Sequence, residues 1–408
     1  MIPGRRSIAE PTVDEYYRSG AWRRETLLDD FLARVDDDPD AVAIVGYRRG
    51  VAEPDRLTYG QLELASRRCA AALLDLGVEM GQAVSVQLPN IWQFPALVYG
   101  ILRVGAIVNP LVPIFRHREL AFILGRTGSR ILVVPDVFAG HDHAAMALGL
   151  REEVGTLEHV VIVGGPGTGL DDRSPGVAFE PFFTGREWEH EAGLADELAK
   201  RRPAADDLVE IQFTSGTTGE PKGVLHSHNT VRSGGRAIDE VYGLGADDVG
   251  FMASTLAHQT GFGYGLLKPL SMGMTVVYQD VWDVEQMLDA VETEKIVWTV
   301  SATAFAMDMV AAQRRRARNV DSFRFFICGG APIPPVVVED AAEVLRAELI
   351  AVWGMTENMI VTTTRPGDPV ELVSDSDGTP VDWMEIRVVD PAGRPVEVGR
   401  SGDLQTRG

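Results

Sequence analysis

The stretch that decides the fold is Thr214-Ser215-Gly216-Thr217-Thr218-Gly219-Glu220-Pro221-Lys222-Gly223. It holds three glycines, four hydroxyl residues and one lysine within ten positions. Glycines let the backbone turn several N–H groups toward one point, where they bind an anion. Hydroxyl groups add donors, and a lysine adds a charge that reaches a phosphate oxygen. Apolar runs precede and follow the stretch, so it is predicted to be a phosphate-binding loop between two strands. The residues expected to bind phosphate are Thr214, Ser215, Gly216, Thr217, Thr218, Gly219 and Lys222.

The Walker A loop is a poor match to this stretch. It requires Gly-x-x-x-x-Gly-Lys-Ser/Thr running into a helix. Lys222 instead follows a proline and precedes a glycine, so we expect it to open a strand. A flexible polar hairpin loop without a ligand is the other alternative. The density of hydroxyl residues and the Pro-Lys-Gly ending argue against it.

The stretch closely resembles the signature Thr-Ser-Gly-Thr-Thr-Gly-x-Pro-Lys-Gly of the adenylate-forming superfamily. That superfamily includes acyl-CoA synthetases, the adenylation domains of peptide synthetases and firefly luciferase. The resemblance implies an α/β fold, the large N-terminal domain of the family, with two α/β/α sheet subdomains and the start of a small β-barrel. It also implies ATP or AMP, Mg²⁺, and coenzyme A as the second substrate.

The composition is that of an acidic globular protein. The chain has 408 residues, 45% of them hydrophobic, and a formal charge of −21. Such a charge disfavours binding to nucleic acid or to an anionic membrane, and no apolar run approaches the ~20 residues of a membrane span. Cys69 and Cys328 form neither a zinc motif nor a disulfide framework. This cysteine usage, together with a start that lacks the pattern of a signal peptide, predicts a cytoplasmic location.

Apolar strands alternate with amphipathic helices along most of the chain, which predicts parallel sheets covered on both faces. One helix is expected to begin after Thr58, which would serve as its N-cap. Toward the end the pattern changes to short alternating strands. The predicted organisation is a first α/β subdomain over 1–205, a second over 206–375 with the phosphate loop and the adenine and acyl pocket, and the start of a β-barrel subdomain over 376–408.

Two other clusters are interpreted as structural. The basic run 314–318 is predicted to be the solvated end of a helix. His226 and His228 have no third metal ligand nearby in the sequence. The family usually carries a His-x-Asn pair at this place, which His228 and Asn229 roughly fill.

Two later segments carry residues suited to a nucleotide. Gly329-Gly330-Ala331-Pro332 follows an apolar run, and small residues there let a flat ring or an acyl chain approach the backbone. Trp353-Gly354-Met355-Thr356-Glu357 combines a stacking ring, a hydroxyl and a carboxylate in a predicted loop. A strand-to-helix turn and an ordinary helix start would also explain these segments.

In the family the matching segments pack against adenine, contact the α-phosphate and bind Mg²⁺, and Trp353 takes the place of the usual tyrosine. The resemblance therefore assigns Thr356 and Glu357 to catalysis and Glu357 to the metal. The further nucleotide-binding residues that it implies are Gly330, Ala331, Pro332, Trp353, Gly354, Met355 and Thr356.

The remaining segment is Ala257-His258-Gln259-Thr260-Gly261-Phe262-Gly263. An isolated histidine in a glycine-rich loop is more often structural than functional. The family, however, often has a histidine here, at the mouth of the carboxylate pocket, and the run resembles the version found in ligases for short- or medium-chain and alicyclic acids. The resemblance makes His258 a catalytic candidate, and the expected pocket residues are His258, Gln259, Thr260, Phe262 and Gly329.

The order and spacing of these segments follow the family along essentially the whole chain. The family's later signatures, including the catalytic lysine of its small C-terminal lid domain, have no counterpart before Gly408. The lid domain is therefore expected to be missing from this polypeptide, which alone is expected to be inactive or weakly active.

The leading hypothesis is an ATP-dependent acyl-CoA ligase that converts a medium-chain or cyclohexanecarboxylate-like acid to acyl-AMP and then to acyl-CoA. An aryl- or fatty-acyl-AMP ligase that loads a carrier protein is one alternative. A non-catalytic module that binds an acyl-adenylate or a nucleotide is another. The expected partners are a carboxylic acid, ATP, and CoA or a carrier protein, with no nucleic acid; a homodimer stays open.

Overall fold

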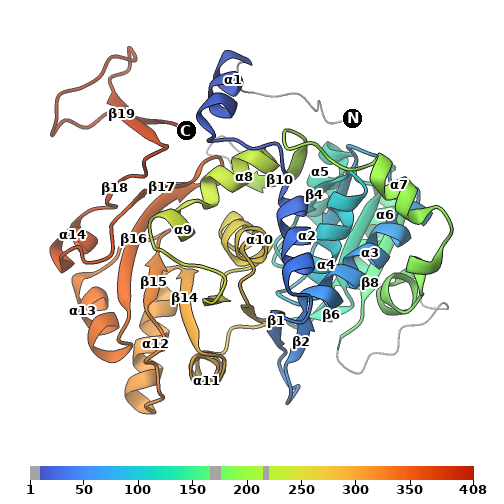
Figure 1. The fold of residues 1–408 in the computed structure, drawn as a ribbon, viewed down its shortest axis with the longest axis horizontal. Coiled ribbons are helices and arrows are strands. Elements are labelled where there is room, and N and C mark those ends of the chain that lie inside the picture. Colours follow the sequence, from blue (N-terminus) through green and yellow to red (C-terminus); the bar gives the residue numbers. More distant parts are fainter. Residues whose placement is uncertain (1–9, 166–175, 215–219) are drawn as a thin grey trace. The chain divides into compact units, whose positions relative to one another are not determined.

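The computed structural model describes residues 10–165, 176–214 and 220–408 (Figure 1). The chain divides into two units. The first comprises Met1–Arg232 and Gly245–Asp283, and the second comprises Ser233–Leu244 and Val284–Gly408. The strands on both sides of the predicted phosphate loop belong to the first unit. The subdomain limits expected from the sequence stay a prediction.

The first unit contains a seven-stranded sheet in the order β11-β10-β4-β3-β5-β8-β9. All neighbouring strands are parallel except β10 and β11, which form an antiparallel hairpin. The central strands β3, β4 and β5 are buried along their whole length, as apolar strands of a parallel sheet should be. The strands are β3 (Ala83–Val86), β4 (Ile107–Pro110), β5 (Ile131–Pro135), β8 (His159–Val163), β9 (Val177–Ala178), β10 (Leu208–Thr214) and β11 (Lys222–Ser227).

The same unit holds a second group of strands in the order β12-β13-β1-β2, in which only β1 and β2 pair antiparallel. These are β1 (Val42–Tyr47), β2 (Asp55–Thr58), β12 (Val249–Met252) and β13 (Val276–Gln279). A short hairpin joins β6 (Val137–Phe138) to β7 (His141–Asp142).

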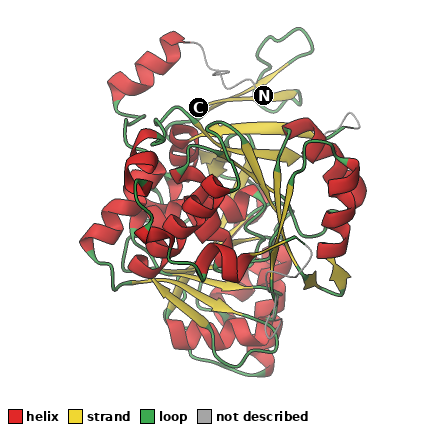
Figure 2. Cartoon of the chain, turned by 90° about the vertical axis from the view of Figure 1, so that its right-hand side faces the viewer, coloured by secondary structure: helices red, strands yellow, loops and turns green. Residues whose placement is uncertain are grey.

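Helices lie against these strands, as Figure 2 shows in red and yellow. Thr58 caps its helix as predicted: its side chain accepts from the backbone N–H of Gln61, and the Gln61 side chain accepts from the Thr58 N–H. Apolar side chains near the N-terminus are buried, including Trp22 and Phe31. The α-helices are α1 (Glu10–Ser19), α2 (Leu27–Asp37), α3 (Tyr59–Asp75), α4 (Gln93–Arg103), α5 (His117–Thr127), α6 (His143–Glu153), α7 (Leu194–Lys200), α8 (His228–Gly235), which crosses the boundary between the units, and α10 (Lys268–Met272). The other helical segments are η1 (Glu180–Thr184), η2 (Trp188–His190) and η3 (Thr260–Leu267).

The second unit has strands in the order β18-β17-β16-β15-β14. β14, β15 and β16 are parallel, and β17 and β18 continue antiparallel. The strands are β14 (Ile296–Ser301), β15 (Phe325–Cys328), β16 (Glu348–Met355), β17 (Met359–Thr363) and β18 (Thr379–Pro380). The helices are α9 (Ala237–Glu240), α11 (Val284–Glu294), α12 (Thr303–Arg315), α13 (Pro335–Val344) and α14 (Val370–Asp375).

The end of the chain forms a separate antiparallel pair, β19 (Glu385–Val389) with β20 (Asp403–Arg407). Both strands were predicted from their alternating pattern, and a barrel built on them stays a prediction. Among the described residues, no helix is both long and apolar enough to cross a membrane.

The basic run 314–318 lies at the end of α12, as predicted, but it is not simply solvated. Arg314 pairs with Asp340 of α13, and Arg315 pairs with Glu285 of α11 at 2.8 Å. The side chain of Arg318 is almost fully buried and also pairs with α11. The run therefore joins three helices of the second unit, which the spacing of charges along one helix does not reveal.

Candidate functional site

The predicted phosphate loop closes the β10–β11 hairpin. Thr214, the last residue of β10, lies directly opposite Lys222, the first residue of β11. Lys222 therefore opens a strand, as predicted, and its side chain is exposed while Thr214 is half-buried. Ser215, Gly216, Thr217, Thr218 and Gly219 lie outside the described residues. The described ends of the loop are thus held together by strand pairing.

One face of β10 is polar, although the strand lies within the sheet. Glu210, Gln212 and Thr214 alternate along it and so share a face. Glu210 is 0% exposed, and this burial raises the pKa of its carboxyl to about 8, while the approach of the Gln259 amide opposes the rise. Gln212 donates from Nε2 to the Ala257 carbonyl oxygen at 3.0 Å. The strand that leads into the phosphate loop therefore also holds the segment expected to line the acid pocket.

That segment is a tight turn followed by a helix, and not the glycine-rich loop that the sequence predicts. The N–H of His258 donates to the Thr255 carbonyl at 3.1 Å, and the π-helix η3 begins at Thr260. A Cβ on Gly261 would lie 2.0 Å from the Thr255 carbonyl oxygen, so the turn requires glycine there. Phe262 is fully buried in the first turn of η3, and its place in a pocket wall stays a prediction. π-Helical turns are frequent at functional sites.

His258 stands at the surface of this turn. Its Nδ1 accepts from the N–H of Thr260 at 3.3 Å. The ring keeps access to solvent, but the protein around it removes enough water to lower its pKa, which favours the neutral imidazole. Gln259, next to it, points inward and is 4% exposed. The turn thus presents one ring outward and one amide inward.

Asn90 secures the other side of the turn. Its Nδ2 donates to the Ser254 carbonyl at 2.9 Å, and its Oδ1 accepts from the Leu256 N–H at 2.8 Å. Sequence reasoning missed Asn90, Glu210 and Gln212. For Glu210 and Gln212, the alternating polar positions within β10 were the only local signal. The sequence near Asn90 does not indicate which residues it binds.

In the second unit, two of the predicted segments meet at the carboxyl ends of neighbouring strands. β15 and β16 are parallel, so Gly329 follows Cys328 beside the Val352 end of β16. A Cβ on Gly329 would lie 2.6 Å from the Val352 carbonyl oxygen, whereas one on Gly330 would meet nothing within 4 Å. Gly330 has φ +86° and is exposed. The backbone at Gly330 is therefore accessible, and the approach of a flat ring to it stays a prediction.

Ala331 and Pro332 continue this exposed edge. The hydroxyl of Thr303, at the start of α12, donates to the Pro332 carbonyl at 3.3 Å and lies 3.4 Å from the Cys328 Sγ. This hydrogen bond holds the turn after β15 against α12, while Ala331 and Pro332 stay exposed.

The segment 353–357 differs from its prediction as a loop or helix start. β16 runs through Met355, and Thr356 and Glu357 form the tip of a hairpin to β17. Gly354 is required there, because a Cβ would lie 2.0 Å from the Met359 carbonyl oxygen. The pairing with β17 extends the strand further than its own sequence indicates.

At this tip Glu357 is exposed, and Thr356 and Trp353 are half-buried. The Trp353 ring is therefore partly accessible. Mg²⁺ at nucleotide sites takes one or two carboxylates, and substrate phosphates and water complete its shell. An exposed Glu357 fits that role. Within the described residues, no group of three or more histidine, cysteine or acidic side chains could form a closed metal cage.

The two neighbouring histidines are buried, as expected for structural residues. His228 Nδ1 accepts from the Leu27 N–H at 3.1 Å, which satisfies the start of α2. Burial lowers the pKa of His228 to about 3, so its ring is neutral. Asn229 accepts from the Arg23 N–H at 3.1 Å. The His-Asn pair at the start of α8 therefore fastens the backbone at Arg23 and at Leu27, the first residue of α2, within the first unit.

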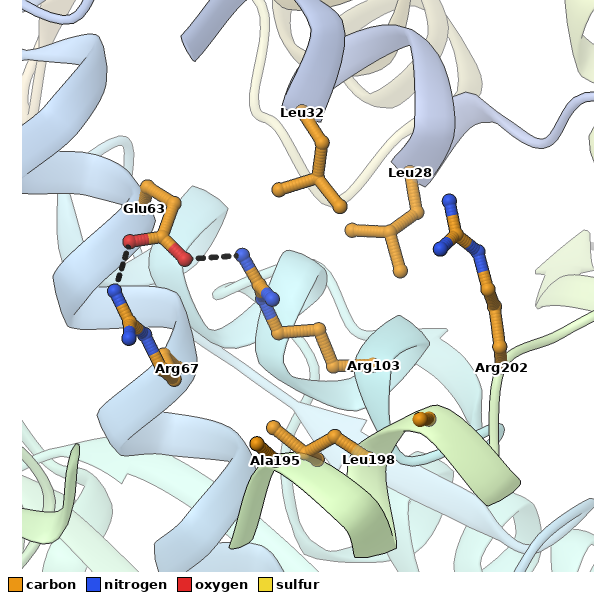
Figure 3. A pocket seen from close by; sticks show the side chains of 9 residues that line it. Leu28, Leu32, Glu63, Arg67, Arg103, Ala195, Leu198 and Arg202 are labelled. Carbon is orange, nitrogen blue, oxygen red and sulfur yellow. Dashed lines mark hydrogen bonds and ion pairs between the residues drawn. The ribbon is translucent and has the colours of Figure 1, made fainter. Parts of the chain in front are cut away.

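A hollow elsewhere in the first unit is lined by none of the predicted site residues (Figure 3). Its volume is about 330 Å³, and leucine side chains of α2 and α7 line it. Glu63 accepts from Arg67 at 2.7 Å and from Arg103 at 2.8 Å. Two ion pairs with Glu63 therefore hold these arginines in the wall of the hollow.

The chain was compared with protein families and with known proteins. The chain matches a family described as AMP-binding enzyme over residues 31–408. Medium-chain fatty-acid–CoA ligase of Escherichia coli (strain K12) is 28% identical over 393 residues, which cover 96% of this chain and 66% of that protein. Salicyl-AMP ligase / salicyl-S-ArCP synthetase of Mycobacterium tuberculosis is 31% identical over 398 residues, 96% of this chain and 67% of that protein.

A solved structure shares the fold. The apo structure of MbtA from Mycobacterium smegmatis has a TM-score of 0.84 and 25% identity, and the match covers 99% of this chain and 71% of that one. The chain thus spans about two thirds of the length of the relatives that it matches.

Proposed function

Since the chain belongs to the AMP-binding enzyme family, we propose that it is the adenylation part of an acid–thiol ligase, which joins a carboxylic acid to AMP and then to coenzyme A. A carboxylate is a poor electrophile, and adenylation gives it a good leaving group. A carboxylate oxygen attacks the α-phosphorus of ATP, and pyrophosphate leaves. No carbon–oxygen bond of the acid breaks in this step. The protein then has mainly to align the groups and to neutralise charge.

The observation that carries this proposal is the pairing of Thr214 with Lys222 at the mouth of the β10–β11 hairpin. It places an exposed lysine at one end of a segment rich in glycine and hydroxyl groups. In our proposal Thr214–Lys222 binds the β- and γ-phosphates. Glu357 would hold Mg²⁺, which supplies charge neutralisation when bound, and Thr356 would contact the α-phosphate.

The adenine and the acid are assigned to other segments. The exposed backbone of Gly330, Ala331 and Pro332 supports a place for a flat ring, with stacking by Trp353, beside Gly354 and Met355. For the acid we propose the turn with His258 and Gln259, together with Thr260, Phe262 and Gly329. A neutral His258 ring suits a hydrogen bond to a carboxylate or to its mixed anhydride.

The acid we propose is medium-chain or alicyclic, because the buried Phe262 and the glycine-rich η3 offer an apolar wall without a fixed charge. An aryl acid that is passed to a carrier-protein thiol is the second candidate. It is favoured by the resemblance to the ligase whose name specifies salicyl-AMP.

Thermal denaturation with non-hydrolysable acyl-adenylate analogues tests the class of acid. We would compare decanoyl, cyclohexanecarbonyl and salicyl adenosine sulfamates with AMP. A ligand present at about 100 times its Kd stabilises the fold by roughly 2.7 kcal/mol. We expect the decanoyl or cyclohexyl compound to stabilise the chain more than AMP does. Stabilisation by the salicyl compound alone would replace the first candidate by the second, and stabilisation by none would contradict the proposal.

The phosphate loop has its own test with a matched control. Lys222→Ala should weaken ATP binding about tenfold, since one charge contact to phosphate is lost. Lys200→Ala, an exposed lysine on α7, should leave ATP binding unchanged. Calorimetry with both variants measures this. Equal loss in both would remove Lys222 from the proposed site.

A further inference from the structure

Asn90 lies in the interior of the first unit, in the connection between β3 and α4, and is 5% exposed. Its Nδ2 donates to the Ser254 carbonyl at 2.9 Å and to the Met252 carbonyl at 3.4 Å. Its Oδ1 accepts from the Leu256 N–H at 2.8 Å. One buried amide therefore binds three alternate residues of the segment that leads from β12 toward η3.

This set of contacts requires an amide at position 90. β12 ends at Met252, so the backbone groups of Ser254 and Leu256 lie beyond the strand, where they still need hydrogen-bond partners. An amide carries both a donor and an acceptor in one plane, as a peptide group does. A carboxylate cannot donate to the carbonyls, and an apolar side chain can neither donate nor accept. Asn90 therefore takes the place that a neighbouring strand would have.

The segment that Asn90 holds runs directly into His258. The N–H of His258 donates to the Thr255 carbonyl at 3.1 Å, so the fixed residues and the histidine belong to one turn. The side chain of Gln212, from β10, holds the same turn by donating to the Ala257 carbonyl at 3.0 Å. The backbone just before His258 is thus bound by amide side chains from two different parts of the first unit.

We infer that Asn90 is a positioning residue of the acid pocket, which fixes the turn that carries His258 by binding its backbone. The inference rests on the proposed function only in calling the place an acid pocket. The turn and η3 carry His258 and Phe262, which are assigned to the acid, whereas the adenine is assigned to segments of the second unit. Loss of Asn90 should therefore weaken binding of the acyl part and leave binding of the nucleotide part unchanged.

Gln87 provides a matched control three positions earlier in the chain. It is also a fully buried amide, but its Nε2 donates to the carbonyls of Val112 and Phe115, at 3.1 and 3.0 Å, and these residues follow β4. The test compares Asn90→Leu with Gln87→Met, since each replaces a buried amide by an apolar side chain of similar size. Asn90→Asp is a milder variant that keeps the size and the acceptor and loses the donor. All three are made in the 408-residue chain.

Hydrogen–deuterium exchange of the backbone gives a readout that needs no ligand. The N–H groups of His258 and Phe262 donate to the carbonyls of Thr255 and His258, so neither bond is removed directly by a change at position 90. In Asn90→Leu we expect both N–H groups to exchange about tenfold faster than in Gln87→Met, because the turn that contains them has lost an anchor. Equal exchange in these two variants would show only a general loss of stability and would overturn the inference.

Calorimetric titration provides the second readout, with AMP and with the adenosine sulfamate that stabilises the wild-type chain most. Asn90→Leu should weaken binding of the acyl compound about tenfold and leave AMP unchanged, while Gln87→Met should leave both unchanged. If Asn90→Leu does not fold, Asn90→Asp is titrated instead, and we expect the same selective loss. Unchanged affinity for the acyl compound, or an equal loss for both ligands, would contradict the inference. If the wild-type chain binds no acyl compound, the proposed function fails, and the exchange experiment still decides whether Asn90 fixes the turn.

Discussion

The burial of the Glu210 carboxyl predicts how the free energy of unfolding changes with pH. Its pKa rises from 4.5 to about 8 on folding because of burial. Between these two values the native chain keeps a proton that the unfolded chain releases, so stability falls as the pH rises. Each pH unit in this window removes about 1.4 kcal/mol, and the whole window removes about 5 kcal/mol.

The perturbation is Glu210→Gln, which cannot ionise. We would measure the free energy of unfolding of both proteins in guanidinium chloride at several pH values from 5 to 8 and take their difference. His258 in the turn is present in both proteins, so its contribution cancels. We expect the variant to gain on the wild type by about 1.4 kcal/mol per pH unit.

The control is Ile211→Val, which should lower stability by about 0.5–1.5 kcal/mol at every pH. The reasoning would be refuted if the difference between wild type and Glu210→Gln also stayed constant over this range. That result would mean that the carboxyl ionises in the native state near its ordinary pKa, and hence that water reaches it.

Three other predictions concern His228, two glycines and the two cysteines. Because His228 stays neutral while an unfolded histidine takes a proton near pH 6.5, the wild-type chain should lose stability on acidification below that pH. His228→Asn should make the free energy of unfolding less dependent on pH in this range. An equally strong pH dependence in the variant would exclude His228 as the cause. Gly329→Ala should destabilise the chain by about 1–3 kcal/mol in thermal denaturation, because the new methyl group meets a backbone carbonyl. Gly125→Ala, at an open and exposed position in α5, should stabilise it by about 0.5–1 kcal/mol. A change in stability of the same sign in both variants would contradict the packing around Gly329. Burial raises the pKa of both thiols, Cys69 and Cys328, so a thiol reagent should label neither in the native chain and both after unfolding, and rapid native labelling would show that one is accessible.

Much of the fold follows from local patterns. Apolar strands that alternate with amphipathic helices predicted the parallel sheets, and Thr58 predicted the start of α3. The proline before Lys222 indicated a strand after the phosphate loop, which β11 confirms. In each case neighbouring residues determine the local conformation.

What the sequence did not predict depends on distant partners. Trp353–Met355 contain a glycine and were expected to form a loop, but pairing with β17 draws them into β16. Thr260–Leu267 were expected to be irregular because of their glycines, and they form η3, where Gly261 and Gly265 lie close to other chain segments. Tertiary packing overrides local propensity in both places.

The candidate site shows the same limit. The residues of the phosphate and nucleotide segments could be named from motifs, whereas the supporting Asn90, Gln212 and Glu210 could not. Asn90 lies more than 160 positions from the turn that it binds. No pattern within a short window connects residues at that separation.

The central claim is that one molecule binds through both an adenosine part and an acyl part. It is tested most directly by calorimetric titration of the chain with the best acyl adenosine sulfamate, with the same compound lacking the acyl group, and with the free acid. We predict that the whole compound binds at least about 100-fold more tightly than either part, since joining two bound parts saves the entropy of bringing them together. An adenosine part that binds as tightly as the whole compound would contradict the account and leave only a nucleotide-binding protein.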